Sequence, residues 1–198
     1  MRNFRTPKSA DDDSRLSRWQ RAIFSDWEAN AGSRDSQIIL AMFRQAQWSN
    51  THWGKWSKLF TVPYWWIVSV VVGIELPPEL RVGPRLRIFH PHGIVVNFNA
   101  IIGSDCILRH GVTIGNKVDS FGNQSSSPRL GDRVELGAGC AVIGDIELED
   151  DCCVGALAVV TKSVAARAVM AGNPARQIST RESPNFTDPV IDLASHRE

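Results

Sequence analysis

Residues 130–160 read LGDRVELGAGCAVIGDIELEDDCCVGALAVV, and a large aliphatic residue recurs at every sixth position of this stretch. A period of six fits neither an amphipathic helix, whose period is 3.6, nor a half-buried strand, whose period is 2. It predicts a solenoid in which each group of six residues supplies one short strand and one tight corner. The positions that define the period are Leu130, Leu136, Val142, Leu148, Val154 and Val160.

The same period occurs earlier in the chain and is interrupted once. Val96, Ile102, Leu108 and Ile114 keep the spacing of six, but the interval from Ile114 to Leu130 is not a multiple of six. The interruption, residues 116–129, is polar and rich in serine, with a glycine at 122, so we expect a loop that extends from the coil and carries function. Three groups of six would make one turn of a triangular coil.

Composition sets limits on partners and compartment. The chain has 198 residues and a net charge of +1, which gives no electrostatic case for a nucleic-acid partner. Cys106, Cys140 and Cys152 fall at small inward positions of the period, which predicts buried core thiols in a reducing cytoplasm rather than a disulfide set. No signal peptide is recognised, and the longest nearly apolar stretch, residues 64–74, is too short to span a bilayer.

The first third of the chain is expected to be helical. We predict a disordered start over residues 1–12, a helical region over 13–78, a β-coil over 79–178 with the loop at 116–129, and a tail over 179–198. Within the helical region, helices are expected over 12–30, from a cap at Ser36 onward, and over 55–73 with an interruption at Pro63. These helices are expected to cap the end of the coil or to join assemblies together.

All seven tryptophans lie in this helical region. Most are expected to pack between helices. A peripheral contact of Trp56, Trp65 and Trp66 with a membrane surface is left open.

Three histidines lie close together in the sequence. His92 and His110 are separated by three groups of six, so a coil with that repeat would stack them about 4.8 Å apart. His90 lies two positions before His92, at the corner that leads into that face. Three roles are open: a general base that takes a proton from a hydroxyl group, a metal site that would need a third histidine, and hydrogen-bonded corner residues.

Several segments resemble one family of hexapeptide-repeat acyltransferases. FHPHGIVV, residues 89–96, and DWEAN, residues 26–30, resemble serine acetyltransferases. RHGVTIGN, residues 109–116, and VELGA, residues 134–138, resemble a sub-group of colanic-acid type acetyltransferases that act in exopolysaccharide synthesis. AGNPAR, residues 171–176, is typical of both.

The resemblance covers roughly residues 20–178. It implies a mainly β protein, a left-handed parallel β-helix with an N-terminal α-helical region. It also implies acetyl-CoA as co-substrate and a homotrimer or dimer of trimers with active sites at subunit junctions.

The resemblance also implies roles for individual residues. His90 matches the catalytic histidine, and His110 is a second catalytic candidate. Backbone groups near Gly137, Ala138, Ala156 and Leu157 would contact the pantetheine arm of acetyl-CoA. Lys162 and Arg176 would meet its phosphates or remain solvated. The substrate-binding candidates are Asp26, His92 and Asn116, and no metal is expected.

Departures from the serine acetyltransferase pattern bear on the acceptor. The aspartate before the catalytic histidine is Phe89 here, a glutamate further on is Phe98, and an Arg-His pair of the loop is Ser126-Ser127. Serine is a zwitterion and needs partners for both charges. We therefore predict an acetyl-CoA-dependent O-acetyltransferase whose acceptor is a hydroxyl-bearing small molecule, a sugar or saccharide of exopolysaccharide synthesis.

Three alternatives remain. The chain would be a serine O-acetyltransferase of cysteine biosynthesis, a zinc-dependent carbonic anhydrase, or a scaffold without catalytic activity. The expected location is cytoplasmic, with the inner face of a membrane as the other position considered.

Overall fold

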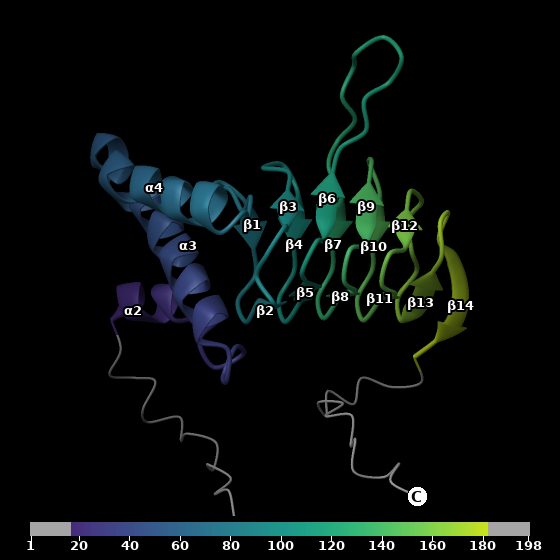
Figure 1. Ribbon diagram of the computed structural model, residues 1–198, viewed down its shortest axis with the longest axis horizontal. Helices are drawn as coiled ribbons and strands as arrows, with labels where there is room; N and C mark the ends of the chain where they lie inside the picture. The colour runs from purple at the N-terminus through teal and green to yellow at the C-terminus, as the bar shows by residue number, and fades with distance from the viewer. Residues whose placement is uncertain (1–16, 182–198) are drawn as a thin grey trace, which may run out of the picture.

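The computed structural model describes residues 17–181, in which three sheets, parallel except for the last strand, follow a helical region (Figure 1). Sheet 1 contains β1 (Arg81–Val82), β4 (Ile101–Ile102), β7 (Arg129–Leu130) and β10 (Glu147–Leu148). Sheet 2 contains β2 (Arg87–Phe89), β5 (Ile107–Arg109), β8 (Glu135–Leu136), β11 (Cys153–Val154), β13 (Ala168–Ala171) and β14 (Arg176–Thr180). Sheet 3 contains β3 (Val95–Val96), β6 (Thr113–Gly115), β9 (Ala141–Ile143) and β12 (Val159–Val160).

The chain visits the three sheets in rotation, so its turns gather along three edges. The charged edge joins sheet 1 to sheet 2, with corners at 84–85, 104–105, 132–133, 150–151 and 166–167. The histidine edge joins sheet 2 to sheet 3, with corners at 90–93, 110–111, 138–139 and 156–157. The loop edge joins sheet 3 to sheet 1 and carries residues 97–99, the long loop 116–128, and residues 144–145 and 161–163. Figure 1 shows the long loop projecting well beyond the other turns.

Strand register confirms that three groups of six make one turn, and it locates three departures from that repeat. One lies at the end of the coil, where Val154 pairs with Met170, two positions earlier than the period predicts. Leu130 pairs with Leu148, three groups of six later, whereas the interval between the partners Ile102 and Leu130 is lengthened by the long loop. Val96 pairs with Ile114 at the regular interval, whereas Ile88 pairs with Leu108, two positions further along than the period predicts. The corner between Ile88 and Val96 is therefore longer than the others by two positions, and His90 lies in it.

The inward positions of the period form the core. The six aliphatic residues from Leu130 to Val160 are 0–3% exposed, which confirms their predicted orientation. Cys106, Cys140 and Cys152 are fully buried and unbridged. Burial raises the pKa of the Cys106 and Cys140 thiols to about 12, so these side chains act as small core groups.

The helical region differs from prediction at its boundaries. Helix α2 (Arg18–Ile23) begins at a capping box on Ser17 and ends before the expected limit, and residues 24–32 form turns. Helix α3 (Arg34–His52) begins after Ser33, so the predicted cap at Ser36 is wrong. The expected third helix exists as three consecutive pieces, the 3₁₀ turn η1 (Gly54–Ser57), α4 (Lys58–Trp65) and the π-helix η2 (Trp66–Val71). Pro63 lies within α4, and the change of helix type comes at Trp66 instead.

The helical region caps the open edge of the coil with side chains. The Leu86 N–H donates to Asp26 Oδ1 at 2.9 Å, and the Leu86 carbonyl accepts from Asn30 Nδ2 at 2.8 Å. The Ile88 N–H donates to Asn30 Oδ1 at 3.0 Å, and the Ile88 carbonyl accepts from the Ser36 hydroxyl at 2.9 Å. Because β2 is the last strand of sheet 2, these side chains take the place of a further strand.

At the opposite end, β14 pairs antiparallel with β13 and closes sheet 2. It continues to Thr180, beyond residue 178, where we expected the coil to end. The expected disordered start and the tail from residue 182 onward lie outside the described residues.

Candidate active site on the histidine edge

His90 and His110 come together at the enlarged corner of the histidine edge. Their ring centroids are 6.0 Å apart, with the ring planes at 70° to each other. Both side chains are exposed, and within residues 17–181 neither ring has a hydrogen-bond partner. His90 has a φ of 55°, a left-handed conformation that turns the chain sharply at this point. The pair is accessible to a substrate.

The ring that contacts His110 is that of His90, not that of His92 as the period predicted. The backbone does follow the prediction, since the Gly111 N–H donates to the His92 carbonyl at 2.9 Å. The lengthening of the first corner brings His90 beside His110. The His92 side chain is exposed and lies within electrostatic range of Asp35, whose pKa is lowered mainly by a hydrogen bond from Ser33 and slightly by His92.

The backbone positions predicted to contact acetyl-CoA continue the same edge. The Gly139 N–H donates to the His110 carbonyl, and the Leu157 N–H donates to the Ala138 carbonyl, both at 2.9 Å. These bonds stack the corners of His110, Ala138 and Leu157 in one column. Leu157 is 75% exposed with a φ of 58°.

Gly137 is needed for this stack. A Cβ atom at Gly137 would lie 2.5 Å from the backbone nitrogen of Ala156. The absence of a side chain therefore lets two successive corners approach closely.

The two predicted phosphate-binding cations lie on different edges. Arg176 pairs with Ala171 at the start of β14, and Ala171 lies 3.6 Å from the position of a Cβ at Gly155, so Arg176 is near the end of the histidine edge. Lys162 follows β12 on the loop edge. A single chain does not bring Lys162 to the histidine edge.

Phe89, directly before His90, lies between two cations. The guanidinium carbons of Arg87 and Arg109 lie 4.5 Å and 4.9 Å from the centre of its ring. Arg109 also pairs with Glu135 at 3.2 Å, and Glu135 pairs with Arg181 at 2.7 Å. Sequence reasoning noted Phe89 but missed the arginines. Arg109 becomes apparent only from the pairing of β2 with β5, in which Phe89 lies beside Arg109 because the interval between the two strands is two positions longer than the regular repeat.

Asn116 lies at the base of the long loop, on the loop edge. Its Oδ1 accepts from Asn97 Nδ2 at 3.2 Å, and its Nδ2 donates to Gln124 Oε1 at 3.1 Å. The Ser127 hydroxyl donates to Asn97 Oδ1 at 2.9 Å, and Ser127 is only 5% exposed. These side chains fasten the loop base, and Asn116 does not join the histidines within one chain.

Asp26 has a different role from the one predicted. Its carboxylate is 2% exposed and accepts from Arg44 Nε at 2.7 Å, from Arg44 Nη2 at 3.1 Å and from the Leu86 N–H. Arg44 in turn donates to the carbonyls of Val82 and Gly83. Asp26 therefore holds the helical region on the coil, and this geometry argues against the substrate-binding role.

Metal ligation finds no support in the described part of the chain. Within residues 17–181, no three His, Cys, Asp or Glu side chains are grouped to hold an ion. His52, one of the two histidines outside the coil, stacks on Trp48 at the end of α3, with ring centroids 3.8 Å apart. His196 lies outside the described residues.

Comparison with known proteins places the chain in a family. It is 33% identical over 161 residues to the putative colanic acid biosynthesis acetyltransferase WcaB of Escherichia coli strain K12, covering 78% of this chain and 97% of WcaB. It is 34% identical over 135 residues to a serine acetyltransferase of Mycobacterium tuberculosis, covering 68% of this chain and 57% of that protein. The chain belongs to the hexapeptide-repeat acetyltransferase family of WcaB and the serine acetyltransferases. No protein-family model matches the chain.

As a member of this acetyltransferase family, the protein is an O-acetyltransferase with acetyl-CoA as its donor. Solved structures of serine acetyltransferases share its fold. That of Neisseria gonorrhoeae superposes with a TM-score of 0.71 at 20% identity, covering 86% of this chain and 70% of that one. The soybean apoenzyme superposes with a TM-score of 0.65 at 26% identity, covering 85% and 72%.

Proposed function

We propose that this acetyltransferase transfers the acetyl group of acetyl-CoA to a hydroxyl group of a sugar or saccharide, on a left-handed parallel β-helix. The observation that carries the proposal is the His90–His110 pair at one end of a column of stacked backbone corners, all on one edge. If the long arm of acetyl-CoA followed that column, its reactive thioester end would lie beside this histidine pair.

His90 is the general base of the proposed reaction. It takes the proton of the acceptor hydroxyl as the oxygen attacks the thioester carbonyl carbon. The tetrahedral intermediate then expels the CoA thiolate by breaking the C–S bond. His90 returns its proton to the thiolate, so the products are an acetyl ester and free CoA thiol. No acetyl-enzyme forms, because both substrates are held side by side.

The donor would lie along the histidine edge. Its pantetheine arm would follow Ala138, Ala156 and Leu157, and Arg176, near the far end of this edge, would meet a phosphate. Lys162 and Asn116 lie on the loop edge and would reach this donor only from a neighbouring subunit. We therefore propose a homotrimer with its sites between subunits. Static light scattering tests this assembly, and a monomer would contradict it.

The surroundings of His90 favour a neutral acceptor. The residue before His90 is an aromatic ring held between two guanidinium groups, where a zwitterionic acceptor would need a carboxylate for its amine. In the long loop, Ser127 is buried against Asn97 and supplies no cation for a substrate carboxylate. A sugar hydroxyl needs neither partner. The name of WcaB, which points to colanic acid biosynthesis, agrees with a saccharide acceptor.

A thiol-release assay separates the two acceptor classes. Purified full-length protein would be given acetyl-CoA with free serine, and separately with hexose and oligosaccharide acceptors. We expect CoA release above the background hydrolysis rate with a saccharide and none with serine. Turnover with serine and not with any saccharide would replace this proposal by a serine O-acetyltransferase.

A further inference from the structure

The helical segment before the coil has an apolar face that nothing among residues 17–181 covers. Along residues 56–71, eight apolar side chains are exposed. Trp65, 55% exposed, lines a groove described below, and the other seven follow one another at intervals of one, three or four residues, which places them on one side of a helix. We call them the outer face: Trp56 69%, Leu59 70%, Val62 52%, Trp66 58%, Ile67 45%, Val70 50% and Val71 77% exposed. Contiguous apolar surface of this kind marks an interaction site.

The opposite side of the same segment already packs against the rest of the protein. Tyr64 is 3% exposed and Val68 is fully buried, and the Tyr64 hydroxyl donates to the Leu76 carbonyl at 2.6 Å. Figure 1 shows α4 beyond the β1 end of the coil, with α2 lower in the view on the same side of the coil. The helix is therefore held in place by one side and presents the outer face to its surroundings.

Charge distribution indicates what covers the outer face. No aspartate or glutamate occurs between Asp35 and Glu75, whereas Lys55 and Lys58 lie where the apolar face begins. Lys55 Nζ lies 5.8 Å from the ring centre of Trp56. Glu75 and Glu79 line a groove of about 860 Å³ that Val62 and Trp66 of the outer face also line, so acidic groups lie along that one border of the face. The outer face itself is apolar, and Lys55 and Lys58 lie at its start, away from the border with the acidic groove.

An apolar face bordered by lysines and rich in tryptophan matches a lipid surface with anionic headgroups. Tryptophan favours the boundary between headgroups and acyl chains, and lysine is attracted to the negative surface potential. No helix among residues 17–181 is long and apolar enough to cross a bilayer. We propose that the outer face docks on the surface of an anionic membrane, with the helix lying in the plane of the interface.

Vesicle sedimentation with the full-length protein tests this proposal. Vesicles of phosphatidylcholine alone would be compared with vesicles that also contain phosphatidylserine, at low and high salt. We expect binding to the anionic vesicles that weakens with salt. Replacing the two tryptophans of the outer face, Trp56→Ser with Trp66→Ser, should weaken binding about tenfold or more, because that apolar area is no longer removed from water on binding. Lys55→Gln and Lys58→Gln should each weaken it about fivefold.

Trp27→Ser is the matched control, because Trp27 is 40% exposed but lies in the turns after α2, where its ring packs against Phe24. It should bind vesicles like the unmodified protein. Circular dichroism confirms that each variant is folded. Absence of binding to anionic vesicles would overturn the proposal, and so would unchanged binding by the double tryptophan variant. If the unmodified protein does not bind vesicles and the double tryptophan variant forms a smaller assembly by light scattering, the outer face would instead be assigned to contacts between copies of the chain.

Discussion

The histidine edge and the charged edge are built by the same backbone geometry and used in opposite ways. Both turn the chain through left-handed residues, such as His90 and Leu157 on one edge and Arg85 and Arg133 on the other, with φ between 55° and 60°. On the charged edge the side chains satisfy one another. On the histidine edge the corners carry small residues, exposed rings and an exposed leucine. Identical corners thus become a brace or a binding site according to their side chains.

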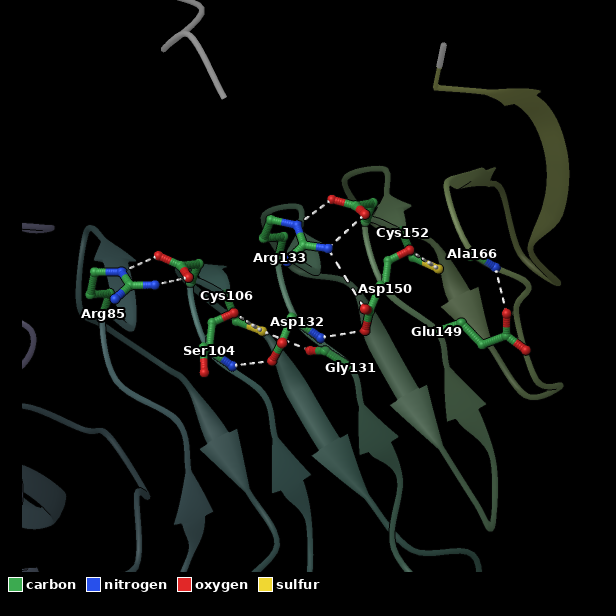
Figure 2. A network of polar contacts seen from close by, with 12 residues as sticks. Arg85, Ser104, Cys106, Gly131, Asp132, Arg133, Glu149, Asp150, Cys152 and Ala166 are labelled. Atoms are coloured by element: carbon green, nitrogen blue, oxygen red, sulfur yellow. Dashed lines mark hydrogen bonds and ion pairs between the residues drawn. The ribbon is translucent and has the colours of Figure 1, made fainter. Parts of the chain in front are cut away.

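Figure 2 shows how the charged edge is closed. Arg85 pairs with Asp105, and Arg133 Nε donates to Asp151 Oδ1 at 2.6 Å. Asp132 Oδ1 accepts from the Ser104 N–H at 2.7 Å. The stacked left-handed positions alternate in charge: Arg85, Asp105, Arg133, Asp151 and Arg167. These carboxylates are already paired with arginines or backbone N–H groups of the protein, so they are not free to bind a ligand.

The largest effect on activity is expected when the imidazole ring of His90 is removed from the histidine edge. His90→Ala should lower kcat/KM about 10²–10⁴-fold, as for loss of a general base, while the protein stays folded because the side chain is exposed. His110→Ala should cost less, about tenfold, if His110 only supports the base. Steady-state thiol-release kinetics measure both. Near-normal turnover of folded His90→Ala would remove His90 from the mechanism.

The second largest effect is expected when a methyl group is added between two stacked corners of the histidine edge. Gly137→Ala should destabilise the protein by about 1–3 kcal/mol and weaken acetyl-CoA binding, because its Cβ has no room beside Ala156. Gly115→Ala is the matched control, since its Cβ would meet only Ile143 Cδ1 at an ordinary 3.5 Å. Urea denaturation and calorimetric titration of acetyl-CoA test this pair. Equal stability of the two variants would show that the corners are not closely packed.

The charged edge should contribute to stability in a pH-dependent way without affecting catalysis. The hydrogen bond from Arg133 lowers the pKa of Asp151 below its ordinary 3.8. A lowered carboxyl pKa stabilises the folded state above the unfolded pKa, and this contribution is lost as the pH falls through the folded pKa. Asp151→Asn should therefore cost about 1 kcal/mol at neutral pH.

This cost should shrink below about pH 4, where Asp151 becomes protonated in the unfolded chain. Urea denaturation at several pH values measures it. Turnover of Asp151→Asn should equal that of the unmodified enzyme, and a loss of turnover would contradict the division between the two edges.

The smallest effect is expected at the exposed end of the charged edge. The Arg85 side chain is 57% exposed, so water screens its pair with Asp105. Arg85→Met should change the free energy of unfolding by no more than about 0.5 kcal/mol. Thermal denaturation tests this, and a large destabilisation would show that the alternating column acts as a cooperative network.

The period of six was enough to predict most of the coil. Each inward aliphatic residue must be buried, and each turn of the coil repeats the one before it. A local pattern such as Leu130 to Val160 is therefore enough to predict the strands and the core, and an interruption of the pattern predicts the loop. The positions of Ala138 and Leu157 as contacts of the donor came from the family resemblance, and the structure stacks their corners with that of His110. The sequence thereby determined the architecture and the main candidates for the site.

Only the tertiary structure decided how the coil begins and which histidines meet. The corner between Ile88 and Val96 is longer by two positions, and which of its side chains faces His110 depends on their packing rather than on the period. The cap formed by Asp26, Asn30 and Ser36 joins residues more than 50 positions apart in the sequence. Hydrogen bonds between distant segments leave no periodic trace, because they depend on where the finished helices lie against the strand edge.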